Sequence, residues 1–234
     1  MPLRLLPLVT GLLPIIGIHA SYLIAVQFSR VPACLPYFSG CTSISSTGRH
    51  PPASYLFKAV MLPEAILLMA FWICCAGWLQ ALEGTIDSRR HRGTPQLVFL
   101  GCSGAFALIL YVTFLGTHEA FYEFMRRFGI YMFFLLTMLA QLDLSLRFRY
   151  YAVASGNGSL RPLSQLLLVL VALPFVLGAL NLTLKAVLAN PDPPENAIEW
   201  IVVLLMQSHI ALTYFAWRAT GFKNTFSVSG TGRP

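Results

Sequence analysis

The sequence predicts an all-α, polytopic membrane protein: a bundle of six transmembrane helices with both termini in the cytoplasm. Three observations support this fold class. The chain of 234 residues is 56% hydrophobic and only 11% charged, whereas a soluble domain has about 25% charged residues. The apolar residues form six long runs. Lys and Arg cluster in the connections between the runs, unevenly on the two sides.

A helix needs about 20 predominantly apolar residues to cross the hydrocarbon core of a bilayer. The first run follows a basic residue, as in a signal peptide, but it is too long for a signal-peptide core, so we expect an uncleaved span. Residues 224–234 are rich in Ser, Gly and Thr and are predicted to be a flexible tail. The rest, 1–223, is predicted to be one membrane domain with spans at 5–26, 55–82, 95–115, 124–146, 163–188 and 198–217.

The distribution of basic residues predicts the orientation. One side, which includes both termini, carries ten of the 16 Lys and Arg residues, and this excess marks the cytoplasm. The loops 34–58, 118–127 and 190–198 are then expected on the outside. Because the basic residues form short clusters between spans, we exclude a nucleic-acid partner and expect membrane lipids as partners, with a membrane protein as a further option. The plasma (inner) membrane of a bacterium or the Golgi or another endomembrane of a eukaryote would fit; the oligomeric state is left open.

The loop 34–58 is the most polar long segment of the chain. It is dense in Ser, Thr, Gly and Pro, which favour turns. It also contains Arg49 and His50. Cys34 and Cys41 would lie in an oxidising compartment, where a disulfide is plausible, but their spacing alone leaves open whether they are bonded.

Ionisable side chains within spans are expensive and need a physical reason. Asp143 precedes Arg147 by one turn, which allows an ion pair. The other groups fall in the predicted outer half or near the middle, and two interpretations stay open. They could surround a polar cavity under the loop, or they could pair with each other, Lys185 with Glu64 or Glu199, and only fix helix packing. The six groups are His19, Glu64, Asp143, Lys185, Glu199 and His209.

The sequence contains no nucleophile elbow, phosphate-binding loop, dinucleotide fingerprint, HExxH or CxxC motif. We therefore expect no cofactor and no metal. Ser45 or Ser46 with His50 or His118 could form a serine-type site, although the hydroxyl residues of 42–47 are more simply a hydrogen-bonded turn.

Three segments of the chain stand out together: SISSTGRHPP (43–52), THEAFYEF (117–124) and EWIVVLLMQSHIALTYFAWRATGFKN (199–224). They resemble the Frag/DRAM/Sfk superfamily, which includes the Golgi post-GPI-attachment lipid-remodelling factor and the damage-regulated autophagy modulators. The resemblance implies six spans and a role in lipid handling, such as GPI-lipid remodelling or reacylation, membrane-lipid organisation or autophagy regulation. It supplies no catalytic mechanism. The positions of interest that it implies are Ser45, Ser46, Thr47, Gly48, Pro51, His118, Glu119 and Glu199.

The leading functional hypothesis is a membrane protein that binds a GPI-type lipid or phospholipid headgroup from the non-cytoplasmic leaflet, or assists its remodelling. Whether it is an enzyme is left open; His118, Glu119 and His50 are the candidate catalytic residues. The alternatives are a lipid acyltransferase or hydrolase with a histidine base, a small-solute transporter, and a scaffold that uses basic cytoplasmic residues such as Arg89, Arg90 and Arg92. The candidate ligand-binding residues are Ser45, Ser46, Thr47, Arg49, Glu64, Lys185, Glu199 and His209.

Overall fold

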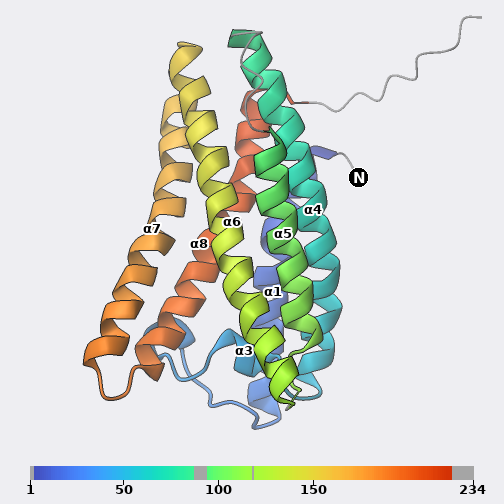
Figure 1. Ribbon diagram of the computed structural model, residues 1–234, viewed down its shortest axis with the longest axis vertical. Helices are drawn as coiled ribbons and strands as arrows, with labels where there is room; N and C mark the ends of the chain where they lie inside the picture. The colour runs from blue at the N-terminus through green and yellow to red at the C-terminus, as the bar shows by residue number, and fades with distance from the viewer. Residues whose placement is uncertain (1–2, 87–93, 118, 223–234) are drawn as a thin grey trace, which may run out of the picture.

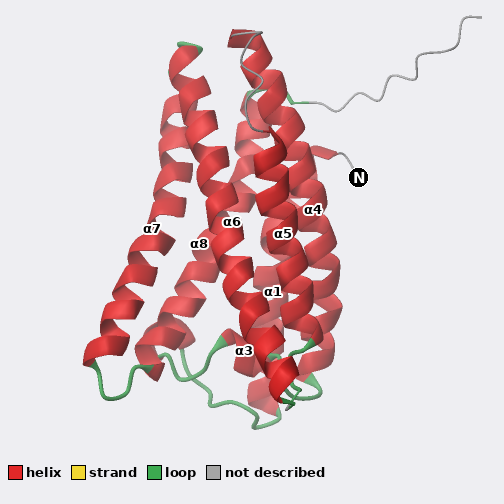
Figure 2. Cartoon of the chain, in the orientation of Figure 1, coloured by secondary structure: helices red, strands yellow, loops and turns green. Residues whose placement is uncertain are grey.

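The computed structural model describes residues 3–86, 94–117 and 119–222. Over these ranges the chain is helical with no strand (Figure 2). A 3-10 turn, η1 (Leu3–Leu5), precedes the first helix, and α2 (Pro36–Ser39) and α3 (Ile44–Thr47) are short. Six helices are long and apolar enough to cross a membrane: α1 (Leu6–Gln27), α4 (Ala53–Ile86), α5 (Thr94–Thr113), α6 (Ala120–Ala154), α7 (Leu160–Val187) and α8 (Asp192–Ala219).

The six-helix fold class is therefore confirmed, and the helices follow the order of the predicted spans. The largest difference in bounds is at α6, which extends eight residues beyond the predicted end at residue 146. Arg147 and Arg149 stopped the predicted span, yet charged residues continue a helix readily once it leaves the hydrocarbon. The predicted tail, 224–234, lies outside the described residues.

The long helices run up and down in one bundle (Figure 1). Helices α4, α5 and α6 pack in succession, α1 packs against both α4 and α8, and α7 packs against α6 and α8. The loop between α1 and α4, with α2 and α3, covers one end of the bundle, which we call the α3 end. Which end faces the cytoplasm stays a prediction.

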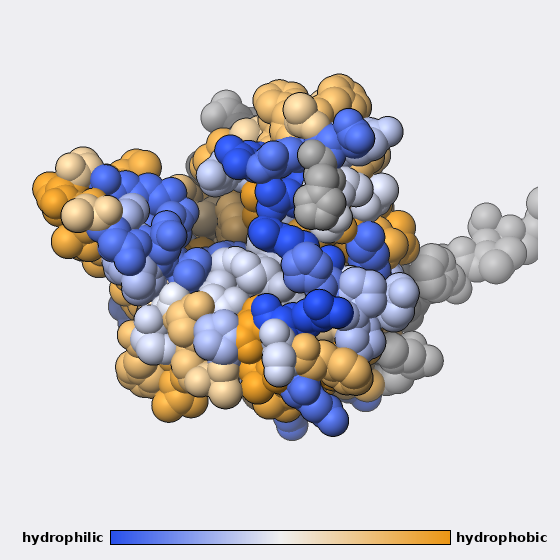
Figure 3. Space-filling model, turned by 90° about the horizontal axis from the view of Figure 1, so that it is seen from below, coloured by the Kyte–Doolittle hydropathy of each residue, from blue (hydrophilic) through white to orange (hydrophobic). Residues whose placement is uncertain are grey.

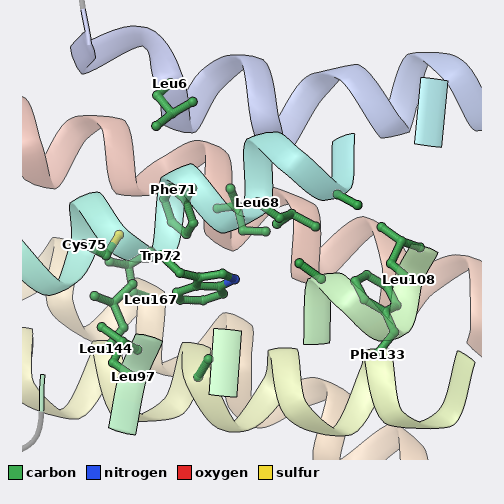
Figure 4. Packing of buried hydrophobic residues seen from close by; sticks show 14 of the residues in the cluster. Leu6, Leu68, Phe71, Trp72, Cys75, Leu97, Leu108, Phe133, Leu144 and Leu167 are labelled. Carbon is green, nitrogen blue, oxygen red and sulfur yellow. The ribbon is translucent and has the colours of Figure 1, made fainter. Parts of the chain in front are cut away.

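Aromatic residues fill much of the interior. Trp72 of α4 is completely buried and occupies the space left by Gly101 of α5, where a Cβ atom would lie 2.2 Å from the indole ring. Figure 4 shows side chains of α4, α5, α6 and α7 converging around Trp72. Near the opposite end, Trp78 donates a hydrogen bond to the Thr220 hydroxyl, 2.9 Å away, and so links α4 to the end of α8.

Helix α7 is the exception to this close packing. Only 17% of its most apolar stretch is buried, against 44% for each of the other five spans. Its buried residues end at Pro174, and nothing lies within 4 Å of where a Cβ on Gly178 would be. Toward the α3 end, α7 therefore leaves the bundle and exposes apolar side chains, including Val176 and Leu182.

The loop at the α3 end is fixed to α8 through its backbone. Trp200 Nε1 donates to the Thr42 carbonyl and Asn196 Nδ2 donates to the Gly40 carbonyl, both at 2.9 Å. Gly40 has a φ of +56°, and a Cβ atom there would lie 1.7 Å from the Pro193 carbonyl oxygen. The loop can approach α8 this closely only because residue 40 is a glycine.

We predict that Gly40→Ala lowers the thermal stability of the detergent-solubilised protein more than Gly156→Ala does. Gly156 is a matched control because it also has a positive φ, +68°, but open space around it. Both changes incur the left-handed penalty of about 1–2 kcal/mol, and only Gly40→Ala also pushes the loop off α8. Equal losses in melting temperature would show that the close approach contributes nothing.

Candidate functional site

Helix α3 is built from the serine-rich part of the loop. Ser43 caps it: the Ser43 hydroxyl accepts from the Ser46 backbone N–H at 3.1 Å and contacts the Ser46 hydroxyl at 2.9 Å. The buried Thr47 hydroxyl donates to the Ile44 carbonyl at 2.7 Å. Ser46 and Thr47 are both predicted to bind ligand. In the structure their hydroxyls make hydrogen bonds within the turn, as the interpretation of 42–47 as a hydrogen-bonded turn expects.

Glu199 of α8 meets the beginning of this short helix. Its carboxylate accepts hydrogen bonds from the backbone N–H groups of Ile44 and Ser45. The first N–H groups of a helix have no partner within it, so a carboxylate is a suitable acceptor at this position. The same interaction joins the loop to α8, in addition to the contacts of Trp200 and Asn196.

Ser45 points away from α3 toward α5. Its hydroxyl lies 2.8 Å from the hydroxyl of Tyr111, which is 2% exposed. Glu199, Arg126 and Arg49 all lie close enough to interact electrostatically with Tyr111. Two hydroxyls, one carboxylate and two guanidinium groups thus gather where α3, α5, α6 and α8 meet. We call these five residues the α3-end cluster: Ser45, Arg49, Tyr111, Arg126 and Glu199.

A second group of side chains at this end has a structural role. His19 Nδ1 lies 2.7 Å from the Ile15 carbonyl, which can only accept, so Nδ1 carries the proton. The Nε2 atom of the same ring lies 3.0 Å from the Tyr37 hydroxyl. Burial raises the pKa of Tyr37, which keeps its hydroxyl protonated. Trp200 packs edge-on against both rings, and the group clamps α2 onto the bundle.

Tyr22 and a disulfide hold the loop segment before α2. The Tyr22 hydroxyl lies 2.8 Å from both the backbone N–H and the carbonyl of Cys34. Cys34 and Cys41 are joined by a disulfide, with Cα atoms 6.6 Å apart. The covalent bond and the hydrogen bonds together fix the path of the loop above α1.

Lys185 pairs differently from the expectation. Its ammonium group lies 2.5 Å from the Glu195 carboxylate, across the connection between α7 and α8. The predicted pairing with Glu64 or Glu199 is therefore wrong. Glu195 occurs in the first turn of α8, directly across the short turn from the end of α7, so it reaches Lys185 first.

Of the predicted catalytic residues, the structure describes His50 and Glu119. His50 is exposed at the end of the loop, and Glu119 is exposed at the N-cap of α6. His118 lies outside the described residues, as do Arg89, Arg90 and Arg92, so a pair of His118 with Ser45 or Ser46 stays a prediction.

Glu64 and His209 lie deep in the bundle, away from the cluster. His209 is fully buried, and its Nε2 atom lies 2.7 Å from the Ser145 hydroxyl, which links α8 to α6. Glu64 is fully buried with no hydrogen-bond partner for either carboxylate oxygen. His19 contacts Ile15 and Tyr37, and Lys185 pairs with Glu195, so these two groups have partners of their own; a polar cavity shared with Glu64 and Glu199 stays a prediction. Asp143 and Arg147 do form the predicted ion pair, at 3.1 Å.

The surface of the α3 end is polar and hollowed (Figure 3). Seen along the bundle, a recess separates the end of α7 and α8 from the end of α5 and α6. A shallow pocket lies on the loop side of this face, lined by Arg30, Thr42, Ser43, Ser46, Asp192 and Asn196 among others.

Sequence reasoning missed two members of the cluster. Tyr111 lies within an apolar run, where an aromatic residue reads as core. Arg126 was counted only as a basic residue of an outer loop, yet its side chain is 16% exposed. The available signals were weak: a hydroxyl near the outer end of the third span, and one arginine placed within the first two turns of the fourth.

We predict that Ser45→Ala and Tyr111→Phe each lower the free energy of unfolding by about 1 kcal/mol, as expected for a hydrogen bond between neutral groups. Because the two hydroxyls bond to each other, the double variant should lose less than the sum. Thermal unfolding of the four proteins in one detergent measures this coupling. Additive losses would show that the bond does not form in the membrane protein as purified.

No curated protein and no solved structure that was compared matches the chain. A family model does match: the one described as the Frag1/DRAM/Sfk1/Cwh43P N-terminal domain aligns with residues 2–220. The match includes every described helix and the α3-end cluster. The chain therefore belongs to the Frag1/DRAM/Sfk1/Cwh43P N-terminal domain family.

Proposed function

We propose that this protein binds the phosphate-bearing headgroup of a membrane lipid at the α3 end and presents that lipid for remodelling. The observation that supports this function is the α3-end cluster itself. It places charged and hydroxyl groups together at one end of a bundle of long apolar helices. A phosphodiester is the chemistry shared by phospholipids and GPI-type lipids.

The two arginines suit a phosphate. Guanidinium groups donate strong, charge-assisted hydrogen bonds to phosphate oxygens. Among the described residues, the one carboxylate that would compete with a phosphate for Arg126 is that of Glu123, and it lies 3.5 Å from the Arg126 Nη2 atom. The same carboxylate binds the neighbouring Arg127 at 2.6 Å, so Arg126 is the arginine left available to a ligand.

The uncharged and acidic members of the cluster suit the rest of a headgroup. The hydroxyls of Ser45 and Tyr111 can each donate or accept. The carboxylate of Glu199 accepts from backbone groups of α3 and has further lone pairs for a hydroxyl or amine. A headgroup that combines phosphate with hydroxyl or amine groups, such as phosphoinositol, would use both kinds of partner.

The shape of the bundle supports a lipid over a soluble anion. The recess between the end of α7 and α8 and the end of α5 and α6 lies at the same end of the bundle as the cluster (Figure 3). Helix α7 bears exposed apolar residues beyond Pro174, such as Val176 and Leu180. Acyl chains could lie along this surface while the headgroup reaches the arginines. If the α3 end is non-cytoplasmic, as the basic residues predict, the lipid comes from the non-cytoplasmic leaflet.

The arrangement favours binding and presentation over catalysis by these residues. Ser45, the aliphatic hydroxyl of the cluster, has the Tyr111 hydroxyl as its hydrogen-bond partner, and no histidine among the described residues bonds to it. Nucleophilic catalysis by serine needs an adjacent general base. The chemical step of remodelling is therefore assigned to a partner membrane protein.

Arg126→Gln should weaken binding of phosphatidylinositol in lipid nanodiscs about tenfold, since a charge-assisted hydrogen bond contributes about 1.5–3 kcal/mol. Arg127→Gln is the matched control: it is the next residue of the same helix, its side chain is 65% exposed, and it already pairs with Glu123. Binding measured by native mass spectrometry should change less than twofold for this control.

Two further arms identify what is bound. Diacylglycerol, which lacks the phosphate, should bind weakly to the wild type, and neither variant should change this binding. Soluble glycerophosphoinositol, which lacks the chains, should bind more weakly than the intact lipid. Equal effects of the two arginine variants, or tight binding of diacylglycerol, would contradict a phosphate site at Arg126.

A further inference from the structure

Glu64 is the most unusual polar group in the bundle, and the lipid proposal does not use it. It lies in the middle of α4, its exposure is 0%, and neither carboxylate oxygen has a hydrogen-bond partner. An ionised carboxylate in such surroundings is very unfavourable unless it is paired with a cation and hydrogen-bonded.

The contacts of two glycines locate Glu64 relative to α1. Gly17 of α1 is packed directly on Val60 of α4. Glu64 follows Val60 by one turn on the same face of α4, so it also faces α1. Thr10 precedes Gly17 by seven residues, or two turns, and therefore faces α4. Along the bundle axis, Glu64 lies about 6 Å from the Gly17–Val60 contact and Thr10 about 10 Å from it, both in the direction away from the α3 end. Glu64 and Thr10 therefore differ in depth by less than one helical turn.

Helix α8 adds a third polar side chain near this depth. Gly11, next to Thr10, is packed against the backbone carbonyl of Gln207. By the same measure Gly11 lies about 9 Å from the Gly17–Val60 contact, close to the depth of Glu64. The Gln207 Oε1 and Thr10 Oγ1 atoms are both buried without hydrogen-bond partners. The region where α1, α4 and α8 enclose Glu64 is thus polar but unsatisfied.

A proline in α1 leaves one more backbone carbonyl without its helical hydrogen bond. Pro14 lies inside α1 and has no N–H, so the Thr10 carbonyl loses its helical donor. The two Glu64 oxygens, Gln207 Oε1 and the Thr10 carbonyl are all acceptors when Glu64 is ionised. The Thr10 hydroxyl and the Gln207 side-chain amide are possible donors, but neither Glu64 oxygen has a hydrogen-bond partner.

The charged and titratable groups on the surrounding helices do not supply a partner. His19 is bonded to Ile15 and Tyr37 and Asp143 to Arg147, while His209 contacts Ser145 through Nε2 and its Nδ1 atom has no hydrogen-bond partner, Glu64 included. On α4 itself, the backbone of Lys58 lies about 9 Å from that of Glu64, toward the α3 end. Within the described residues, no set of three His, Cys, Asp or Glu side chains is placed to hold a metal ion.

We propose that Glu64 is a proton-binding site: the carboxylate takes up one proton and is held in the bundle as a neutral carboxylic acid. The reaction forms one O–H bond and breaks none within the protein, with water as the source and acceptor of the proton. The new O–H can donate to one of the neighbouring acceptors, such as Gln207 Oε1 or the Thr10 carbonyl. Uptake also removes the buried negative charge, so the two benefits act in the same direction.

Infrared spectroscopy of the full-length protein in lipid tests this directly, since a protonated carboxyl has its own carbonyl absorption. At neutral pH the wild type should show this band and Glu64→Gln should lose its intensity. Glu83→Gln is the matched control: Glu83 lies on the same helix but pairs with Arg147 at 3.4 Å, so the band should remain. A band absent from the wild type, or equal in wild type and Glu64→Gln, would overturn the proposal.

A second measurement on the wild type alone does not depend on a variant that folds. Dicyclohexylcarbodiimide, an apolar reagent, modifies protonated carboxyls in membranes, and peptide mass analysis should map the modification to Glu64. Modification of Glu83 in its place would contradict the proposal. Sodium ions test for a competing ligand: if adding sodium at constant pH abolishes both the infrared band and the labelling, a metal cation displaces the proton from Glu64, an outcome that itself requires the proton site.

Discussion

The arrangement of the α3 end depends on hydrogen bonds from helix side chains to the backbone of the loop between α1 and α4. Tyr22, Asn196 and Trp200 bind the loop at Cys34, Gly40 and Thr42. A loop at a membrane surface carries many backbone polar groups that need partners. Side chains of α1 and α8 provide these partners and so fix the loop in place. As a result, α3 is held within reach of Glu199 and Tyr111.

This constraint explains why the polar residues of the loop have two different uses. The hydroxyls of Ser43, Ser46 and Thr47 are consumed in building α3. Ser45, on the same short helix, points the other way and joins the cluster. Within one helical turn, Ser43, Ser46 and Thr47 therefore stabilise α3 itself, whereas Ser45 contacts Tyr111. The sequence alone does not distinguish these hydroxyl residues.

The buried polar groups divide by depth. Near the α3 end they meet backbone groups, charges and the recess beside α7, which suits exchange of a ligand with the membrane. In the middle, Glu64 is surrounded by apolar residues and a few acceptors, which suits only a ligand as small as a proton. The cost of a buried charge rises steeply between these two environments, so the two glutamates, Glu64 and Glu199, have very different surroundings within one bundle.

The sequence by itself determined the helical class, the six spans and the pair Asp143–Arg147, because hydropathy over 20 residues and i,i+4 spacing are local properties. It also pointed to Ser45, Arg49 and Glu199 through the polar loop and the family resemblance. It could not reveal that Tyr111 and Arg126 complete the cluster, that Glu195 takes Lys185, or that α7 leaves the bundle beyond Pro174. Those facts depend on which helix faces which, and only the tertiary packing of all six spans decides that.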